Sequence, residues 1–412
     1  MNPIQAQTDD PVLCGARHAL FWMVVANGVG VLLSLLLLSP KIGLLFGEWT
    51  YGRWLPLHLN WQLYGWTALP LVAWLFFLFP QSRDSLARAG RVGIWAWSSV
   101  LALGGAYWLS GHTSGKIFLD WTGPLRVLFP AVILSLWATL ALAWRRDDKP
   151  SLLAIPGLIL LLAVPFGLYF ATDPTVYPAV DRSTGGPTGA SLLNSTLSVV
   201  FLLLLVPRAL RHPPKTKSLD RRIWTFFAAN ILLGIYAETL PPSHHHPGQI
   251  ACLGSLLAWL GLLPFYYSRQ QWKNHHPHWQ RALFFWLGIL ILNGFISFLP
   301  GVLDRLKFSD ALVAHSHLAM AGFTSSFLIF ILQQILPQNT AVIFNHPRAY
   351  FSWHLATGGY LCAMLVAGFY ESTNPSFTIF PGLTRDLLYT LRSLCGLVLF
   401  LVSVHWWKAL RS

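Results

Sequence analysis

Residues 152–171 read LLAIPGLILLLAVPFGLYFA, which is twenty residues without a charged side chain. An α-helix rises about 1.5 Å per residue, so a helix of this length crosses the roughly 30 Å hydrocarbon core of a bilayer. Charged residues lie on both sides of the stretch, with Asp147, Asp148 and Lys149 before it and Asp173 after it. This pattern predicts a transmembrane helix.

Apolar stretches of similar length recur along the whole chain, separated by short polar or Pro- and Gly-marked loops. Only 10% of the 412 residues are charged and 54% are hydrophobic, whereas soluble domains carry roughly a quarter charged residues. We therefore predict an all-α, polytopic membrane protein of about twelve transmembrane helices, forming a single domain over 1–412 in the lipid bilayer. The predicted spans are 17–39, 56–80, 92–110, 125–145, 152–171, 190–207, 223–240, 249–267, 281–300, 311–336, 350–370 and 388–407.

The net charge of +13 is better explained by membrane topology than by a nucleic-acid partner. The basic residues lie in loops between spans, with no nucleic-acid-binding motif around them. When the N-terminus is placed inside, 19 of the 28 Lys and Arg residues fall in inner segments. By the positive-inside rule this distribution predicts cytoplasmic N- and C-termini. The first span lacks a basic segment before it and is too long for a signal sequence, so we expect it to be retained.

Histidines near the ends of spans are informative, because buried polar groups in a membrane are costly and are frequently functional. Seven of them fall on the outer side in this topology. They are His58, His112, His244, His245, His246, His315 and His317.

The sharpest pattern is the pair His315 and His317 in a predicted span. Helical residues two apart project about 200° from each other, so one helix can ligate groups on opposite faces. Polar packing is an equally good explanation of the pair alone. Together with His58 at similar depth, the pair predicts one haem with two histidine ligands and one five-coordinate haem.

These residues resemble a known family, subunit I of the haem-copper oxidases, and within it the C-type (cbb-type) cytochrome c oxidases. Residues 50–60, TYGRWLPLHLN, look like the start of helix 2 in that branch, and residues 310–322, DALVAHSHLAMAG, look like its helix 10. The resemblance implies that His58 and His317 are the axial ligands of a low-spin haem b and that His315 binds a second, high-spin haem. It extends to residues 113–121 and 388–396 and to the order of the twelve spans.

The copper half of the family site is less well matched. Family members carry Gly-His near the start of helix 6, where this chain has Gly186-Pro187, so that ligand is missing. The other family ligands are a His-His pair after helix 7, preceded on that helix by a Tyr. In this chain the corresponding residues are Tyr236 and, at a spacing about two residues longer than in the family, His244, His245 and His246. The resemblance implies a copper site with Tyr236 as a hydrogen donor, and the alternative is an exposed histidine loop.

The function implied by the resemblance is that of a haem-binding, cytochrome c oxidase subunit I-like protein of the bacterial inner membrane. Electrons would come from cytochrome c or a cytochrome c-type partner subunit of the respiratory complex, pass through haem b to the high-spin haem, and reduce oxygen to water if copper completes the site.

Three alternatives stay open. The first is a non-catalytic homologue that binds haem as an electron-relay, assembly or sensing subunit, which the missing helix 6 ligand favours. The second is a nitric oxide reductase-like protein, suggested by Glu238, which also fits a carboxylate at a helix end. The third is a transporter without a cofactor, which would be expected to show broken helices in inverted repeats.

Overall fold

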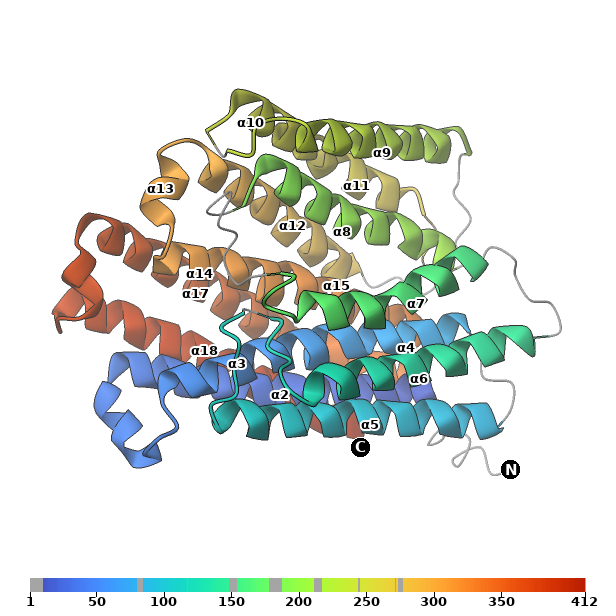
Figure 1. The fold of residues 1–412 in the computed structure, drawn as a ribbon, viewed down its shortest axis with the longest axis horizontal. Coiled ribbons are helices and arrows are strands. Elements are labelled where there is room, and N and C mark those ends of the chain that lie inside the picture. Colours follow the sequence, from blue (N-terminus) through green and yellow to red (C-terminus); the bar gives the residue numbers. More distant parts are fainter. Residues whose placement is uncertain are drawn as a thin grey trace. The chain divides into compact units, whose positions relative to one another are not determined.

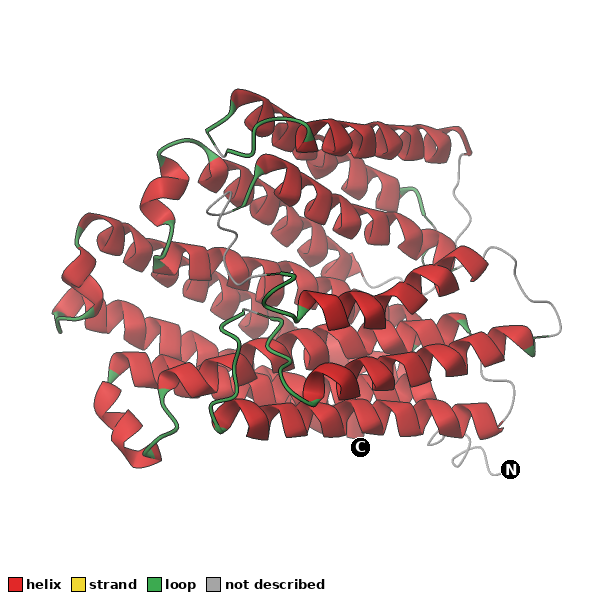
Figure 2. Cartoon of the chain, viewed as in Figure 1, coloured by secondary structure: helices red, strands yellow, loops and turns green. Residues whose placement is uncertain are grey.

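A computed structural model describes residues 10–79, 84–116, 118–147, 154–177, 187–210, 217–243, 245–270, 272 and 277–411. Within these residues all regular structure is helical and no strand occurs (Figure 2). The prediction of an all-α polytopic membrane protein is confirmed to this extent, because ten helices among the described residues are long and apolar enough to cross a membrane. The helices fall into two compact units along the chain.

Unit 1 comprises Met1–Ala179, Ile331–Ala356 and Arg392–Ser412. Most of the helices that lie wholly within it are labelled in Figure 1. Its own elements are α2 (Pro11–Leu38), η1 (Pro40–Phe46), α3 (Tyr51–Asn60), η2 (Trp61–Thr67), α4 (Ala68–Leu78), α5 (Asp84–Leu109), α6 (Leu125–Arg145), α7 (Ala154–Ala171), α16 (Gln338–Ala341) and η5 (Val342–Asn345).

Unit 2 comprises Val180–Phe330 and Thr357–Leu391. Its own elements are α8 (Gly189–Ala209), α9 (Lys217–Glu238), α10 (Pro247–Gly254), η3 (Ser255–Ala258), α11 (Trp259–Ser268), α12 (Pro277–Phe298), α13 (Val302–Leu306), α14 (Asp310–His317), η4 (Leu318–Thr324) and η6 (Pro375–Thr378). Three helices contribute residues to both units, namely α15 (Ser325–Ile335), α17 (Pro347–Thr373) and α18 (Leu383–Arg411).

Each of the twelve predicted spans coincides with a helix or a run of consecutive helical segments. Two of these helices, α9 and α17, are not among the ten apolar enough to be candidate spans. The first turns of α9 carry charged residues, including Arg221 and Arg222, and the middle of α17 carries polar residues and glycines, including His354 and Thr357. The number of twelve membrane crossings therefore stays a prediction, with α9 and α17 as the two helices that are not candidate spans by composition.

The helix α2 begins six residues before the predicted span 17–39, at Pro11. Its N-cap is Asp10, whose side chain accepts a hydrogen bond of 2.8 Å from the backbone N–H of Val12. Pro at the first helical position is favoured because its missing N–H would be unpaired there anyway. The Asp10-Pro11 pair is a start signal that hydropathy does not detect.

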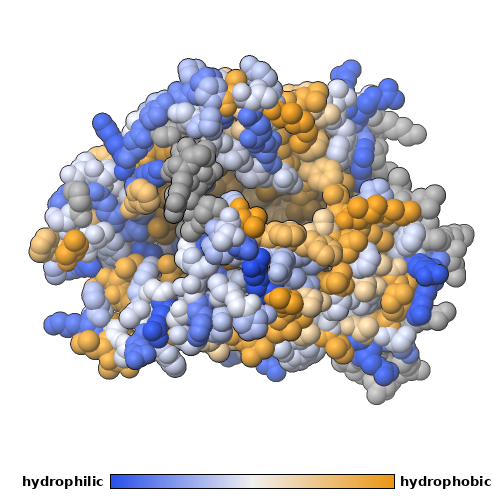
Figure 3. All heavy atoms as spheres, viewed as in Figure 1, coloured by the Kyte–Doolittle hydropathy of each residue, from blue (hydrophilic) through white to orange (hydrophobic). Residues whose placement is uncertain are grey.

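Large apolar side chains are exposed along the helices, as the orange regions of Figure 3 show on the face in view. A soluble monomer rarely exposes such surface over many helices. Hydrocarbon-facing helices satisfy their own backbone hydrogen bonds and can present apolar side chains to lipid. The most exposed of these residues in the helices include Val92, Trp95, Ile159, Leu160, Leu232, Leu355 and Phe369.

Two of the spans contain a π-helical segment. η2 follows α3, and η4 follows α14 and continues into α15. Single π turns are rare in helices and frequently mark functional sites. Each segment begins within three residues of a predicted haem ligand, since His58 lies three residues before η2 and His317 immediately before η4. The interruption of regular α-helix thus coincides with the histidines singled out in the sequence.

Candidate haem-ligand histidines

His58 lies in the last turn of α3, within unit 1, and is half-buried. Its Nδ1 lies 2.8 Å from the backbone carbonyl oxygen of Ala26 on α2. A carbonyl oxygen can only accept a hydrogen bond, so Nδ1 carries the proton and donates it. The neutral ring therefore keeps its lone pair on Nε2.

His317 ends α14, within unit 2, and is also half-buried. Its Nδ1 donates a hydrogen bond of 2.9 Å to the carbonyl oxygen of Val313, one turn earlier in the same helix. The imidazole stacks on the ring of Tyr360 from α17, with ring centroids 4.4 Å apart and planes inclined by 28°. The lone pair of the neutral ring is again on Nε2.

His315 lies on α14 two residues before His317, and its Nδ1 is 2.7 Å from the side-chain oxygen of Asn293 on α12. The amide oxygen is an acceptor, so here too Nδ1 carries the proton. Asn293 was not singled out from the sequence, because nothing in the local pattern of α12 points to a partner on another helix.

A cavity of about 380 Å³ lies beside His315 in unit 2. Cavities of about 300–1,000 Å³ with mostly apolar walls and a few polar groups are typical of ligand sites. The walls come mainly from α8, α12, α14 and η4, and His315 is the ionisable side chain among them. Other lining residues include Leu192, Leu253, Leu287, Leu303 and Phe323.

The three histidines share one arrangement, a donating Nδ1 and a lone pair on Nε2. A histidine that ligates a metal through one nitrogen almost always donates its other N–H to a carbonyl, a carboxylate or water, which fixes the tautomer and the ring orientation. Hydrogen bonding of this kind also satisfies a histidine that merely packs in a helix bundle. The shared arrangement leaves Nε2 of each neutral ring with the lone pair that an axial ligand uses, and it is equally compatible with packing in a helix bundle.

Glycines contact two of these rings. A Cβ added at Gly30 on α2 would lie 2.8 Å from Cε1 and 3.0 Å from Nδ1 of His58. A Cβ added at Gly294 on α12 would lie 3.2 Å from Cε1 of His315. An alanine at Gly30 would therefore collide with the His58 ring, whereas an alanine at Gly294 would require the His315 ring to shift by a few tenths of an ångström.

Gly30→Ala is expected to displace the His58 ring and break its hydrogen bond to Ala26. Overpacking of this kind costs about 1–3 kcal/mol, so we expect the signal per protein of the low-spin haem predicted at His58 to fall severalfold. The measurement is the reduced-minus-oxidised absorption spectrum of the purified variant. Gly28→Ala is the matched control on the same helix, because its added Cβ would meet Phe400 at an ordinary 3.4 Å. An equal effect of both substitutions would contradict the role assigned to Gly30.

The histidine loop after α9 has local structural roles in the described residues. His246 is the N-cap of α10, and its Nδ1 accepts a hydrogen bond of 3.2 Å from the backbone N–H of Gly248. His245 is exposed and lies 3.6 Å from Asp304. His244 lies outside the described residues, as does Gly186.

This tautomer of His246 is opposite to that of His58, His315 and His317, because an accepting Nδ1 leaves the proton of the neutral ring on Nε2. Among the described residues, no group of three or more His, Cys, Asp or Glu side chains lies close enough to hold a metal ion. The described part of the predicted copper site therefore contains a helix cap and an exposed histidine whose Nε2 lies 3.6 Å from a carboxylate oxygen of Asp304.

The two other predicted residues of this region lie on α9. Tyr236 has 56% of its surface exposed. Glu238, the last residue of α9, is exposed and accepts a hydrogen bond of 2.8 Å from the side-chain amide of Asn194 on α8. This placement supports the interpretation of Glu238 as a carboxylate at a helix end.

A carboxyl pair not predicted from the sequence lies at the start of α14 in unit 2. The Tyr389 hydroxyl is 2.9 Å from Asp310 and 3.2 Å from Glu371, and Glu371 accepts a hydrogen bond of 2.6 Å from the backbone N–H of Asp310. The hydroxyl has one proton, so it donates to one carboxylate, and its second contact is a hydrogen bond only if the other carboxyl is protonated. The three side chains tie α14, α17 and α18 together.

Glu371 lies beyond the predicted span 350–370, and burial raises the pKa of its carboxyl above the usual value of 4.5, partly offset by the hydrogen bond from the backbone N–H of Asp310. The folded protein therefore holds this proton more tightly than the unfolded chain. The resulting stabilisation is full below about pH 4.5 and is lost as the pH rises through the folded pKa.

We expect Glu371→Gln to flatten this pH dependence, because the amide stays neutral at every pH. The measurement is the thermal unfolding midpoint of the detergent-solubilised protein at increasing pH from 4.5. If the unfolding midpoint of the variant changed with pH in parallel with that of the wild type, the assignment of the pH dependence to Glu371 would be wrong.

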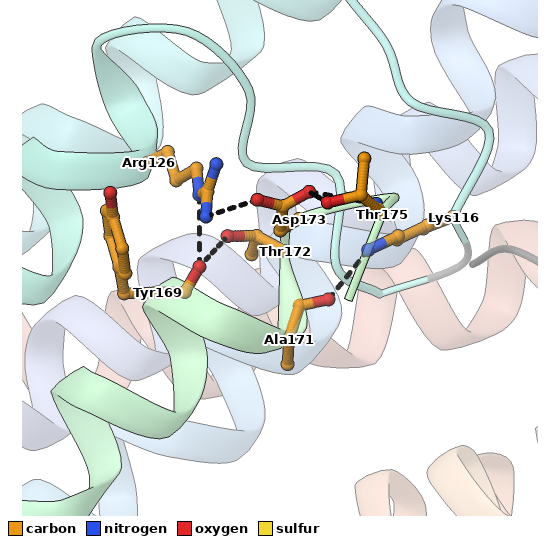
Figure 4. Close-up of polar contacts among 7 residues, drawn as sticks. All are labelled: Lys116, Arg126, Tyr169, Ala171, Thr172, Asp173 and Thr175. Atoms are coloured by element: carbon orange, nitrogen blue, oxygen red, sulfur yellow. Dashed lines mark hydrogen bonds and ion pairs between the residues drawn. The ribbon is translucent and has the colours of Figure 1, made fainter. Parts of the chain in front are cut away.

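The loop after α5 and the start of α6 form hydrogen bonds to the C-terminal end of α7 (Figure 4). Lys116 donates a hydrogen bond of 2.7 Å to the carbonyl of Ala171, and Arg126 donates one of 3.0 Å to the carbonyl of Tyr169. Arg126 also pairs with Asp173 at 2.9 Å. Cations at a helix C-terminus are favourable because the last carbonyls are unpaired and carry partial negative charge.

Hydrogen bonds from the side chain and backbone of Thr175 lower the pKa of Asp173 to about 2, with a smaller contribution from Arg126. Asp173 is thus ionised and available to Arg126 at neutral pH. In the described residues the contacts of this region hold the C-terminal end of α7.

The fold defines a class, that of multi-pass helical membrane proteins. The sequence matches no family model and no curated protein with which it was compared.

Proposed function

We propose that this protein is a haem-binding subunit of a bacterial respiratory complex, similar to subunit I of the haem-copper oxidases, and that it transfers electrons within the inner membrane. In this proposal His58 and His317 are the axial ligands of a low-spin haem b, and His315 is the ligand of a second, high-spin haem.

The observation that carries the proposal is the shared hydrogen bonding of the three histidines. In each ring Nδ1 donates, to Ala26, Val313 or Asn293, and the lone pair stays on Nε2. The sequence pattern selected these histidines independently of that geometry. A π-helical segment after two of them and an apolar cavity beside the third further support it.

The residues fit a haem in chemical terms. Neutral imidazole is a common axial ligand, and haem iron supplies one-electron transfer and, where one axial position is open, ligand binding. The chain would contribute the ligands, their orientation and an apolar surrounding. Ala26, Val313 and Asn293 would fix the three ring tautomers.

Reduction of oxygen to water is a second candidate function. The observation in its favour is the cavity of about 380 Å³ beside His315, which would give a small molecule room near that ligand. A copper ion held by His244, His245 and His246 would have to complete the site, with Tyr236 as hydrogen donor. The cap formed by His246 and the missing helix 6 ligand favour electron transfer without oxygen reduction.

The electron donor in this proposal is cytochrome c or a cytochrome c-type subunit of the same complex, and both chain termini are cytoplasmic. The excess of Lys and Arg in the inner segments supports this orientation. No nucleic-acid partner is proposed.

The deciding experiment is haem and metal analysis of the purified protein in detergent, combined with reduced-minus-oxidised and carbon monoxide difference spectra. Two haems per chain without copper, one of them reactive with carbon monoxide, would support the electron-transfer subunit. Two haems with stoichiometric copper would support the oxidase. A protein without haem would overturn both candidates.

A further inference from the structure

The contact between His317 and Tyr360 carries an inference beyond ligand identity. Tyr360 is buried, with 7% of its surface exposed, and its ring covers one face of the imidazole at a centroid distance of 4.4 Å. The hydrogen bond from Nδ1 to Val313 fixes one ring atom, and by itself it permits the ring to pivot about that bond. A stacked aromatic ring restricts this remaining freedom because it resists tilting of the imidazole plane.

The helix that carries Tyr360 is held firmly against α14 in unit 2. Gly368 on α17 packs on the backbone of Ala311, and an added Cβ would collide with it. Three residues further along α17, Glu371 accepts the hydrogen bond from the backbone N–H of Asp310. With these two contacts, Tyr360 has little freedom to move away from His317.

The plane of an axial imidazole matters for a low-spin haem. Ligand π orbitals interact with the iron d orbitals along directions set by the ring plane, so the angle between two imidazole planes changes the d-orbital splitting. This splitting is visible in the electron paramagnetic resonance (EPR) spectrum of the oxidised iron. Axial ligation and its surroundings also tune the reduction potential.

We propose that Tyr360 is a positioning residue that fixes the plane of the His317 ring and thereby sets the EPR anisotropy and reduction potential of the haem ligated by His317. The inference rests on the proposed function, since it concerns one of the proposed axial ligands.

The test compares Tyr360→Phe, which keeps the stacked ring, with Tyr360→Leu and Tyr360→Met, which remove it. Haem content, EPR spectrum and reduction potential are measured for each variant. Phe369→Leu is the control on the same helix, because Phe369 is 63% exposed. The Met variant keeps an unbranched apolar side chain at the position if the Leu variant does not fold.

We expect Tyr360→Phe and Phe369→Leu to retain the wild-type g values and potential. Tyr360→Leu or Tyr360→Met should retain the haem but show a shifted and broadened low-spin signal, with a changed potential. An unchanged signal in a ring-deleted variant with full haem content would overturn the inference. An equal shift in Tyr360→Phe would also overturn it, because the hydroxyl would then be responsible. Absence of haem from the wild type would instead overturn the proposed function.

Discussion

His58→Ala is expected to abolish the low-spin haem signal and to leave the carbon monoxide-reactive haem in place. Alanine offers no lone pair to the iron, so one of the two proposed axial ligands of the low-spin haem is lost. The ligand proposed for the second haem, His315, is unchanged in this variant. The reduced-minus-oxidised spectrum per protein should lose the low-spin component, and the carbon monoxide difference spectrum should keep its amplitude.

His18→Ala is the matched control for this variant. His18 is another half-buried histidine of unit 1, hydrogen-bonded to Ser98 at 2.6 Å, and it has no part in the proposed site. Retention of the full low-spin signal in His58→Ala would remove His58 from the set of haem ligands.

His315→Ala is expected to have the reverse effect, with loss of the carbon monoxide-reactive haem and retention of the low-spin haem. The ring of His315 is held by Asn293 and lines the cavity, so its removal takes away the only ligand that the proposal assigns to that haem. Carbon monoxide difference spectra and haem content per chain measure the outcome.

Imidazole added to the His315→Ala variant should restore part of the carbon monoxide-reactive signal, because the truncation leaves space where the side-chain ring was. His278→Ala, an exposed position at the start of α12, is the control. If the variant bound two haems and kept its reaction with carbon monoxide, His315 would not be an axial ligand.

Hydropathy and loop signals predicted the positions of the helices well. An apolar stretch of about twenty residues in a membrane forms a helix, because its backbone hydrogen bonds must be satisfied within the segment. They were less informative where a helix mixes charge with apolar surface, as at Arg221 and Arg222 in α9. The early start of α2 had a local signal in Asp10-Pro11, and the cap at His246 had one in Pro247, the first residue of α10.

The ligand candidates could be singled out from residue type and spacing, but their surroundings could not. Asn293, Gly30 and Tyr360 are common residue types, and each acquires its role only when another helix packs beside it. The carboxyl pair of Asp310 and Glu371 is separated by 61 residues in the sequence. Such tertiary contacts leave no periodic pattern in a single sequence.

The two π-helical segments have a consequence for how the length of this chain can vary. A turn closed by i→i+5 hydrogen bonds holds one more residue than an α turn. η2 and η4 can therefore be regarded as single-residue insertions retained within otherwise α-helical spans. Deleting one residue from either segment would leave a helix long enough to cross the bilayer. Because the wider turn absorbs the extra residue, such a deletion would restore a regular α turn and leave the residues before it, including His58 or His317, facing nearly the same way relative to those after it. In related chains, we therefore expect single-residue deletions within the spans to be tolerated at these two segments and to be excluded from the regular α-helical parts, where each deletion would rotate the flanking residues by about 100°.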